Sequence, residues 1–158
     1  MILLRSALFQ LAFYLWTAVS LLACTPLLLG RRRGVIRAQD YWARGALWLL
    51  RLIAGIRLEI RGREHLPEGG AIVASKHQSA FDTFVYHCLL DDPAIVMKRE
   101  LMFIPFYGWF ARKAGMIVVD RRAGANALKR LVRDGKAALA EGRQILIFPE
   151  GTRTAPGT

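Results

Sequence analysis

The chain has 158 residues, enough for a single hydrophobic core, and 54% of them are hydrophobic, which excludes intrinsic disorder, a collagen-like repeat and a coiled-coil rod. Its 23 Lys and Arg exceed its 12 Asp and Glu and give a formal net charge of +11, which favours an anionic partner such as nucleic acid, a lipid headgroup or a phosphorylated substrate. Two cysteines far apart, Cys24 and Cys88, form neither a disulfide framework nor a metal cluster.

The first apolar stretch is typical of a membrane helix. Residues 7–30 carry no charge and consist mainly of Leu, Ala and aromatic residues, and a bilayer is crossed by roughly 20 apolar residues in a helix. Arginines at 31–33 follow at once, so the positive-inside rule places the rest of the chain on the cytoplasmic side of the inner (plasma) membrane. A cleaved signal peptide and a buried core helix are the alternatives, although the run exceeds the roughly 7–15 residues of a signal core.

A second helical stretch, residues 35–54, interleaves tryptophans with arginines. Trp42 and Trp48 alternate with Arg37, Arg44 and Arg51, and such a pattern suits the headgroup level of a bilayer. An ordinary helix packed on the protein, with solvated arginines, explains the same pattern equally well. We therefore predict a membrane-anchoring domain over residues 1–55, with a transmembrane and an interfacial helix.

From residue 56 onward, short apolar runs alternate with helical patterns. The predicted strands cover residues 56–60, 71–75, 94–97, 116–120 and 144–148. The clearest helix is predicted over 125–140, with an apolar stripe made of Leu128, Leu131, Val132, Gly135 and Leu139. This alternation predicts an α/β domain over residues 56–158, built on a mostly parallel sheet flanked by helices.

A histidine and an aspartate stand where the strand 71–75 passes into a helix. His77 lies at the carboxyl end of the strand, where open α/β sheets bind their ligands. Five residues separate His77 from Asp82, and in a regular helix side chains at this spacing point in different directions. The two can meet only if His77 lies in the turn before the helix and Ser79 caps that helix. Such a pair suits a general base, and a capped helix with a surface histidine is the alternative.

The strand 144–148 ends in a polar group at the same predicted edge of the sheet. It consists of Glu150, Gly151, Thr152 and Arg153. Gly151 permits a close backbone approach, and the planar guanidinium of Arg153 suits phosphate oxygens. A strand-terminating turn with a surface ion pair between Glu150 and Arg153 is the alternative.

These motifs resemble those of the glycerolipid acyltransferase family in residues, order and spacing, over about residues 57–153. His77 and Asp82 stand in its H-x-x-x-x-D pattern, and Phe148-Pro-Glu-Gly-Thr-Arg153 matches its third signature at every position. Between them lie two further matches, the second block Gly115-Met-Ile-Val-Val-Asp-Arg121 and the stretch before it, Lys98-Arg-Glu-Leu101 with Pro105-Phe-Tyr-Gly108.

The resemblance implies an enzyme of phospholipid biosynthesis, most similar to the family's lysophosphatidic acid acyltransferases. Such an enzyme moves an acyl group from acyl-CoA or acyl carrier protein to the free hydroxyl of lysophosphatidic acid and forms phosphatidic acid. It implies that His77 is the base and that Asp82 orients it. It further implies an acceptor-binding group made of Lys98, Arg121, Glu150, Gly151, Thr152 and Arg153. Membrane lipid is an implied partner, whereas metal, cofactor and nucleic acid are not.

Two other functions are compatible with the sequence. The same chemistry suits another lysolipid acceptor, such as a lysophospholipid or a lyso-ornithine lipid. A non-catalytic, membrane-bound binder of anionic lipid is a more remote alternative that rests on the net charge alone. Because family members continue well beyond the third signature, we expect the α/β domain of this chain to be incomplete at its carboxyl end.

Overall fold

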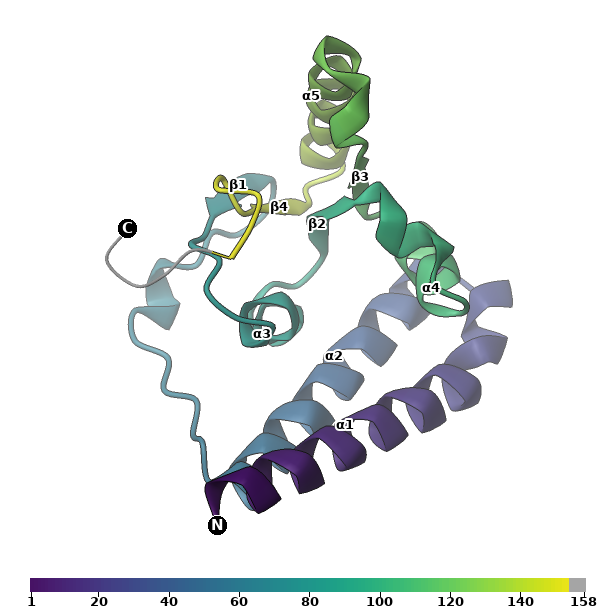
Figure 1. Ribbon diagram of the computed structural model, residues 1–158. Helices are drawn as coiled ribbons and strands as arrows, with labels where there is room; N and C mark the ends of the chain where they lie inside the picture. The colour runs from purple at the N-terminus through teal and green to yellow at the C-terminus, as the bar shows by residue number, and fades with distance from the viewer. Residues whose placement is uncertain (154–158) are drawn as a thin grey trace. The chain divides into compact units, whose positions relative to one another are not determined.

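The computed structural model describes residues 1–153 and divides into two compact units, Met1–His65 and a second unit from Leu66 onward. The first unit is helical (Figure 1). Its helix α1 (Ile2–Cys24) continues as a 3₁₀ helix (Thr25–Leu29), and its helix α2 (Arg32–Leu49) ends in a π-helical segment (Leu50–Ala54). A short 3₁₀ helix (Arg63–His65) closes the unit.

Helix α1 keeps its apolar side chains on the surface. None of its residues is buried, and Ile2–Leu29 is the stretch within residues 1–153 that is long and apolar enough to cross a membrane. A core helix of a soluble protein would bury most of its side chains, so this exposure argues against that alternative. The predicted membrane segment, residues 7–30, covers most of α1, the 3₁₀ helix after it and the following Gly30.

Two tryptophans join α1 to α2 within the first unit. The indole N–H of Trp16 donates to the carbonyl of Trp42 at 2.9 Å, and the indole N–H of Trp42 donates to the hydroxyl of Thr17 at 3.0 Å. Gly45 makes room for this contact, because a Cβ there would lie 2.3 Å from the Trp16 ring. Trp42 thus packs on a neighbouring helix, as the second interpretation of this stretch expects, while Trp48 remains exposed.

The strand predicted over residues 56–60 is wrong. These residues have no regular secondary structure, and Ile56, Leu58 and Ile60 are exposed. Their alternation with polar residues is typical of a strand, but a strand exists only where a neighbour completes its ladder of backbone hydrogen bonds. No such neighbour pairs with this segment in the part of the chain that the structure describes.

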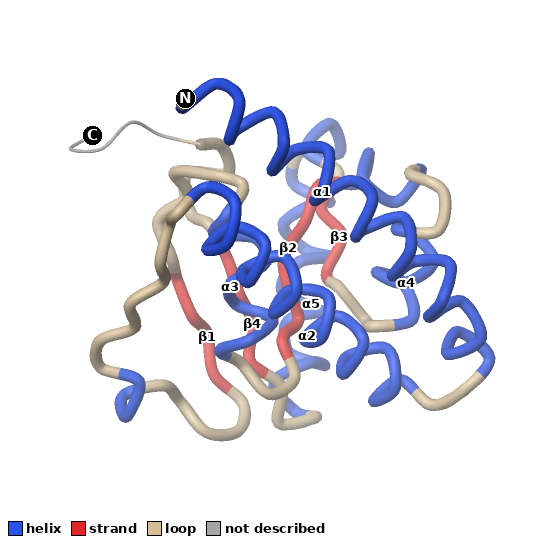
Figure 2. Tube along the Cα trace, turned by 90° about the horizontal axis from the view of Figure 1, so that it is seen from below, coloured by secondary structure: helices blue, strands red, loops and turns tan. Residues whose placement is uncertain are grey.

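The second unit contains a parallel four-stranded sheet, which confirms the predicted α/β class. Its strands are β1 (Ala71–Ala74), β2 (Pro93–Lys98), β3 (Ile117–Val119) and β4 (Gln144–Ile147). Their spatial order is β1-β4-β2-β3, and every neighbouring pair is parallel (Figure 2). All four carboxyl ends therefore lie at one edge of the sheet.

Helices cover the two faces of this sheet. Helix α3 (Phe81–Leu89) and helix α5 (Ala125–Ala140) lie on opposite sides of it (Figure 1). Because side chains alternate along a strand, Ile145 packs toward α5 with Ala138, whereas Leu146 packs with Leu90 beyond α3. Helix α4 (Tyr107–Lys113) precedes β3.

Helix α5 has the predicted bounds but buries only part of the predicted stripe. Gly135 is buried and Leu131 and Leu139 pack against the core, whereas Leu128 and Val132 are exposed. A Cβ at Gly135 would lie 3.4 Å from the end of the Ile145 side chain, which is an ordinary van der Waals distance. The buried residues Gly135 and Ala138 define the covered side of the helix. At about 100° per residue Val132 points away from that side, and Leu128 lies in the first turn, before the residues that contact the core.

Candidate functional site

The residues that the sequence singled out gather at the carboxyl edge of the sheet. His77 follows β1, Lys98 ends β2, Arg121 follows β3, and residues 149–153 follow β4. Since β4 lies between β1 and β2 in the sheet, segments that are far apart in the sequence lie side by side at this edge. Ligands of parallel sheets bind there, outside the carboxyl ends of the strands.

His77 and Asp82 form the expected contact. His77 lies in the turn before α3, Asp82 lies in the first turn of α3, and His77 Nδ1 is 3.3 Å from Asp82 Oδ2. A carboxylate only accepts hydrogen bonds, so the imidazole tautomer that fits carries its proton on Nδ1 and has its lone pair on Nε2. The 3.3 Å separation is slightly longer than is usual for an N–H···O hydrogen bond.

Asp82 is held by the backbone before its helix. The amides of Gln78 and Ser79 donate to Asp82 Oδ2 at 2.6 and 2.8 Å. Burial raises the pKa of Asp82, but these amide hydrogen bonds and the contact with His77 together lower it below its ordinary value of 3.8. Asp82 is therefore a carboxylate at neutral pH, in a fixed orientation toward His77.

The predicted cap of α3 is one residue off. The helix begins at Phe81 with Ala80 in the capping position, and no side chain caps it. The hydroxyl of Ser79 instead accepts from the amide of Phe81 at 3.2 Å. Asp82, in the first turn, accepts from the amides of Gln78 and Ser79, which lie before the helix.

Phe148 supports the ring of His77 from the neighbouring strand. The two rings are stacked, with centroids 4.5 Å apart and planes at 30°. Tyr86 of α3 meets Phe148 edge-on at 6.4 Å, and its hydroxyl donates to Ser75 Oγ at 2.7 Å. Sequence reasoning missed these supporting roles, although the position of Phe148 directly after a strand adjacent to β1 was a usable signal.

Arg121 ties the end of β3 to the loop after β4. Its guanidinium Nη2 donates to the carbonyl of Gly151, while the amide of Gly151 donates to the carbonyl of Phe148 at 2.9 Å. Gly151 has φ of +64°, and a Cβ there would lie 2.6 Å from Arg121 Nη2. Only glycine suits this conformation and this contact, and both backbone polar groups of Gly151 are already used within the protein.

An ion pair joins the ends of β2 and β3 at the same edge. Arg99 Nη1 donates to Asp120 Oδ2 at 2.5 Å, and the amide of Arg122 donates to Asp120 Oδ1 at 3.0 Å. The hydrogen bond from Arg99, followed by that from Arg122, lowers the pKa of Asp120. Lys98, directly before this pair, is exposed. Sequence reasoning assigned no role to Arg99 or Asp120, because their contact depends on the parallel pairing of β2 with β3.

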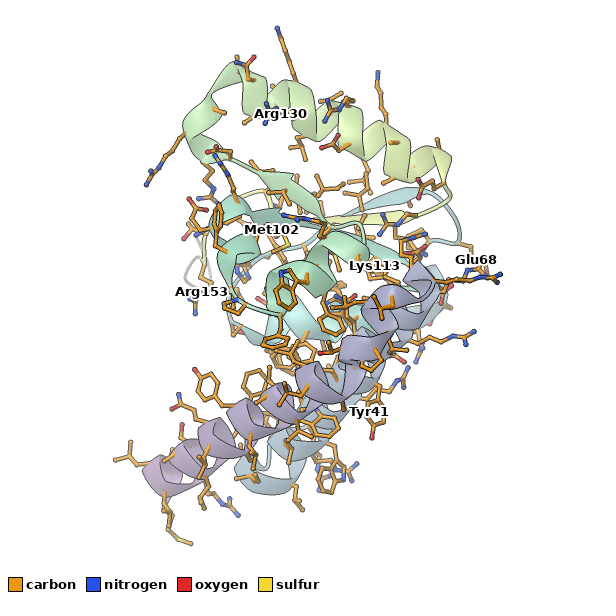
Figure 3. The ribbon with its side chains drawn as sticks, turned by 90° about the vertical axis from the view of Figure 1, so that its right-hand side faces the viewer. Tyr41, Glu68, Met102, Lys113, Arg130 and Arg153 are labelled. Atoms are coloured by element: carbon orange, nitrogen blue, oxygen red, sulfur yellow. The ribbon has the colours of Figure 1, made fainter. Side chains whose placement is uncertain are left out.

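The remaining predicted residues lie on the surface of the loop after β4. Glu150, Thr152 and Arg153 are exposed, and Figure 3 shows Arg153 with its side chain drawn near the end of the described chain. Within residues 1–153, no ion pair forms between Glu150 and Arg153, and no group of three His, Cys, Asp or Glu side chains is placed to hold a metal ion. The side chains of Glu150, Thr152 and Arg153 therefore face solvent, whereas the backbone of Gly151 is hydrogen-bonded within the protein.

The family model for acyltransferases matches residues 57–158. The chain is 39% identical to the 1-acyl-sn-glycerol-3-phosphate acyltransferase of Pseudomonas aeruginosa, over 98% of this chain and 61% of that protein. It is 34% identical to the lyso-ornithine lipid O-acyltransferase of the same organism, over 68% of this chain and 40% of that protein. It thus spans about three fifths of the first relative's length.

A solved structure is similar as well. The 1-acyl-sn-glycerophosphate (LPA) acyltransferase PlsC from Thermotoga maritima matches with a TM-score of 0.77 and 25% identity, over 100% of this chain and 66% of that one. The similarity extends over the helical amino-terminal unit as well as the parallel sheet.

Proposed function

The chain belongs to the acyltransferase family, and we propose that the protein of which it is part transfers an acyl group to the free hydroxyl of lysophosphatidic acid and forms phosphatidic acid. The donor is an acyl thioester, acyl-CoA or acyl carrier protein. The similarity to the Pseudomonas 1-acyl-sn-glycerol-3-phosphate acyltransferase supports this acceptor. The assignment of roles to individual residues belongs to the same proposal.

The proposal rests chiefly on the contact between His77 Nδ1 and Asp82 Oδ2, at 3.3 Å, on the sheet edge that also carries residues 149–153. Asp82 holds the ring with Nε2 unprotonated, and Phe148 restricts its tilt. A base so held removes a proton from a hydroxyl without a protein nucleophile, and such assistance typically contributes about 10²–10⁴-fold to the rate.

The reaction follows from this arrangement. The acceptor hydroxyl gives its proton to His77 Nε2 as its oxygen forms a bond to the thioester carbonyl carbon. The resulting tetrahedral intermediate breaks its carbon–sulfur bond, the ester remains on the acceptor, and the thiolate leaves with the proton from the imidazolium. Asp82 stabilises the imidazolium in between, and its lowered pKa keeps it ionised throughout.

The acceptor's phosphate is assigned to the cationic and polar groups around this base. Arg121 and Arg153 supply guanidinium N–H groups, and Lys98 supplies an ammonium group from the end of β2. One Arg121 nitrogen already donates to the Gly151 carbonyl, so we assign the phosphate contact to its other nitrogens. Gly151 contributes through its small size and conformation, Thr152 through its hydroxyl and amide, and Glu150 orders the loop or contacts the acceptor.

Membrane association is part of the proposal because the acceptor and the product are lipids. Helix α1 inserts its exposed apolar surface into the bilayer, and its length suits a membrane span. The arginines that follow it support a cytoplasmic location for the α/β unit, at the inner membrane, by the positive-inside rule. Cysteine accessibility on either side of intact spheroplasts tests this orientation: a label on the α/β unit reacts only after the membrane is permeabilised.

The activity is tested with the protein of which this chain is part, reconstituted in lipid vesicles. Acyl-CoA and acyl carrier protein are offered separately with lysophosphatidic acid, and phosphatidic acid is measured by mass spectrometry. We expect product from the unchanged chain and none above background from His77→Ala. Vesicle binding without any acyl transfer, by a chain shown to be folded, contradicts the proposal and favours the non-catalytic lipid binder.

A second acceptor is favoured by the similarity to the lyso-ornithine lipid O-acyltransferase of Pseudomonas aeruginosa. Both acceptors carry a free hydroxyl, on which His77 would act, and an anionic group, which the surrounding cations would bind. Competition between lysophosphatidic acid, lyso-ornithine lipid and other lysophospholipids in one reaction decides between them. Preferential acylation of an acceptor without phosphate contradicts the main assignment but leaves the chemistry of His77 intact.

A further inference from the structure

An exposed aromatic segment leaves the sheet beside the candidate site. After β2 the chain forms a 3₁₀ helix (Arg99–Phe103) and then turns into α4. We call residues 103–109 the aromatic loop. Its surface is unusually apolar, with exposed fractions of 73% for Phe103, 48% for Ile104, 39% for Tyr107 and 54% for Trp109. Single exposed apolar residues need no explanation, but a contiguous group of them marks an interaction surface.

The backbone holds the aromatic loop in a fixed and strained shape. Phe106 has φ of 61° and ψ of −55°, and the amide of Tyr107 donates to the carbonyl of Pro105 at 2.6 Å. This is a γ-turn of the rare, strained kind. Gly108 is required beside it, because a Cβ there would lie 2.0 Å from the carbonyl oxygen of Met102.

The segment after the turn is anchored in the protein interior. Phe110 and Ala111 of α4 are buried, while Phe106 contacts the ring of Trp109 at 5.1 Å. The exposed side chains are therefore presented by a rigid frame and not by an unfolded tail. Strain that the surrounding structure maintains is typical of functional segments.

Basic residues flank the aromatic loop on both sides. Lys98 and Arg99 precede it, Arg112 and Lys113 follow it, and Glu100 is the acidic residue between them. The Arg99 guanidinium also lies 6.0 Å from the Phe103 ring centroid. Figure 3 labels Met102, directly before the aromatic loop, and Lys113, at the end of α4. Aromatic rings surrounded by Lys and Arg are typical of the interface between an anionic bilayer and water.

From this composition we infer that the aromatic loop docks on a bilayer containing anionic phospholipid, as a membrane contact of the α/β unit additional to α1. A second copy of this chain fits the loop less well than a bilayer does. Each copy has a net charge of +11, so pairing two copies at this loop would bring like charges together. The inference extends the proposed function without depending on it. The loop begins at the sheet edge that carries His77, so its contact would bring that edge to the lipid surface from which an acceptor comes.

The docking is tested by fluorescence in the full chain reconstituted in vesicles. Cys24 and Cys88 are replaced by Ala, and an environment-sensitive label is attached at Ile104→Cys. The matched control carries the label at Ile72→Cys, the same residue type with 62% exposure on β1. Vesicles contain phosphatidylcholine with or without phosphatidylglycerol, and nitroxide-bearing phospholipid is the quencher.

We expect the label at position 104 to shift to shorter wavelength and to be quenched by the nitroxide lipid, with a loss of both effects when phosphatidylglycerol is omitted or salt is raised. The label at position 72 should remain in water. Emission typical of water at position 104 overturns the inference. So does a blue shift without nitroxide quenching, which means that protein covers the loop.

Kinetic measurements distinguish an effect on membrane docking from an effect on the acyl-transfer reaction. The variant Phe103→Ser with Trp109→Ser should raise the apparent KM for acceptor embedded in vesicles, and leave turnover of a short-chain, monomeric acceptor unchanged. Equal losses with both acceptors, in a variant whose circular dichroism matches the unchanged chain, contradict the inference. Because the fluorescence readout needs no acyl transfer, failure of the proposed activity and failure of docking are distinguishable.

Discussion

The two edges of the sheet use the same residue type in opposite ways. At the amino edge, Arg143 is 4% exposed and directs its guanidinium at Asp92 and at the carbonyls of Pro93, Ala114 and Gly115, over 2.9–3.2 Å. At the carboxyl edge, Arg153 is exposed. Donors satisfied inside the protein stabilise the fold, whereas donors left in solvent can bind a ligand.

In this small domain the amino edge of the sheet contributes to stability, and the carboxyl edge carries the proposed site. Gln144 strengthens the amino edge, since its side-chain amide donates to the carbonyl of Pro67 at 2.9 Å and its oxygen accepts from the amide of Asp92 at 3.3 Å. The carboxyl edge instead positions His77 with a few local contacts. We therefore expect substitutions at the amino edge to lower stability and substitutions at the carboxyl edge to lower activity.

The largest effect is expected at His77. His77→Ala removes the proposed base and should lower kcat by about 10²–10⁴-fold, while vesicle association and thermal stability stay close to those of the unchanged chain. Steady-state assays with reconstituted protein measure the loss. His65→Ala is the matched control, because the His65 side chain is exposed and its imidazole lies 3.6 Å from the Glu64 carboxylate. Near-normal turnover in His77→Ala would falsify the assignment of the base.

The next effect is expected on stability at the opposite edge. Arg143→Met leaves buried carbonyls and Asp92 without their donor, and should lower the free energy of unfolding by about 3–5 kcal/mol. Chemical unfolding in detergent, followed by circular dichroism, measures this. The control Arg130→Met, on the exposed side of α5 (Figure 3), should stay within about 0.5 kcal/mol. Equal stability of the two variants would remove the contrast between the edges.

Arg153→Ala tests the solvent-facing donors. It should raise KM for the phosphorylated acceptor by about tenfold or more, as expected for a lost charge-assisted hydrogen bond. KM for the acyl donor and the free energy of unfolding should change little. Initial-rate measurements with each substrate varied in turn give both constants. Equal increases in the two KM values would argue against a phosphate contact at this position.

Phe148→Leu tests the stacking beneath His77. Loss of an aromatic pair corresponds to about 0.5–1.5 kcal/mol, so we expect kcat to fall by up to about tenfold with little change in either KM. Phe148→Tyr keeps the ring and should restore kcat. The pH dependence of kcat is the second readout, because a ring that only fills the core would not alter it. A fall in stability with an unchanged pH profile would assign Phe148 to packing alone.

The smallest effect concerns the acid stability supplied by Asp82. Its pKa in the folded protein lies below the ordinary 3.8, so its carboxylate stabilises the fold at pH values above 3.8, and this contribution is lost as the pH falls through the lowered value. Asp82→Asn should therefore be less stable than the unchanged chain at neutral pH, with the difference shrinking below about pH 4. Unfolding at a series of pH values checks this. A difference that is constant down to pH 3 would contradict it.

The sequence predicted the elements of the α/β unit well, because their signals are local. Apolar runs of strand length indicated β1 to β4 within about a residue or two, and the periodicity over 125–140 indicated α5. It failed at residues 56–60, where the pattern was right but the pairing partner was missing. It also failed at Leu128 and Val132, because an apolar stripe does not reveal which part of its length and width the sheet covers.

The residue types and spacing of the motifs determined which side chains to consider and which family they resemble. Tertiary structure alone decided which of them meet: β4 inserts between β1 and β2, so Phe148 stacks on His77, and Arg121 reaches Gly151. The buried position of Arg143 was likewise invisible, because an arginine before an apolar strand looks the same whether it faces solvent or carbonyls. The physical reason is that composition and periodicity report local preference, whereas strand order and burial depend on contacts between segments distant in the chain.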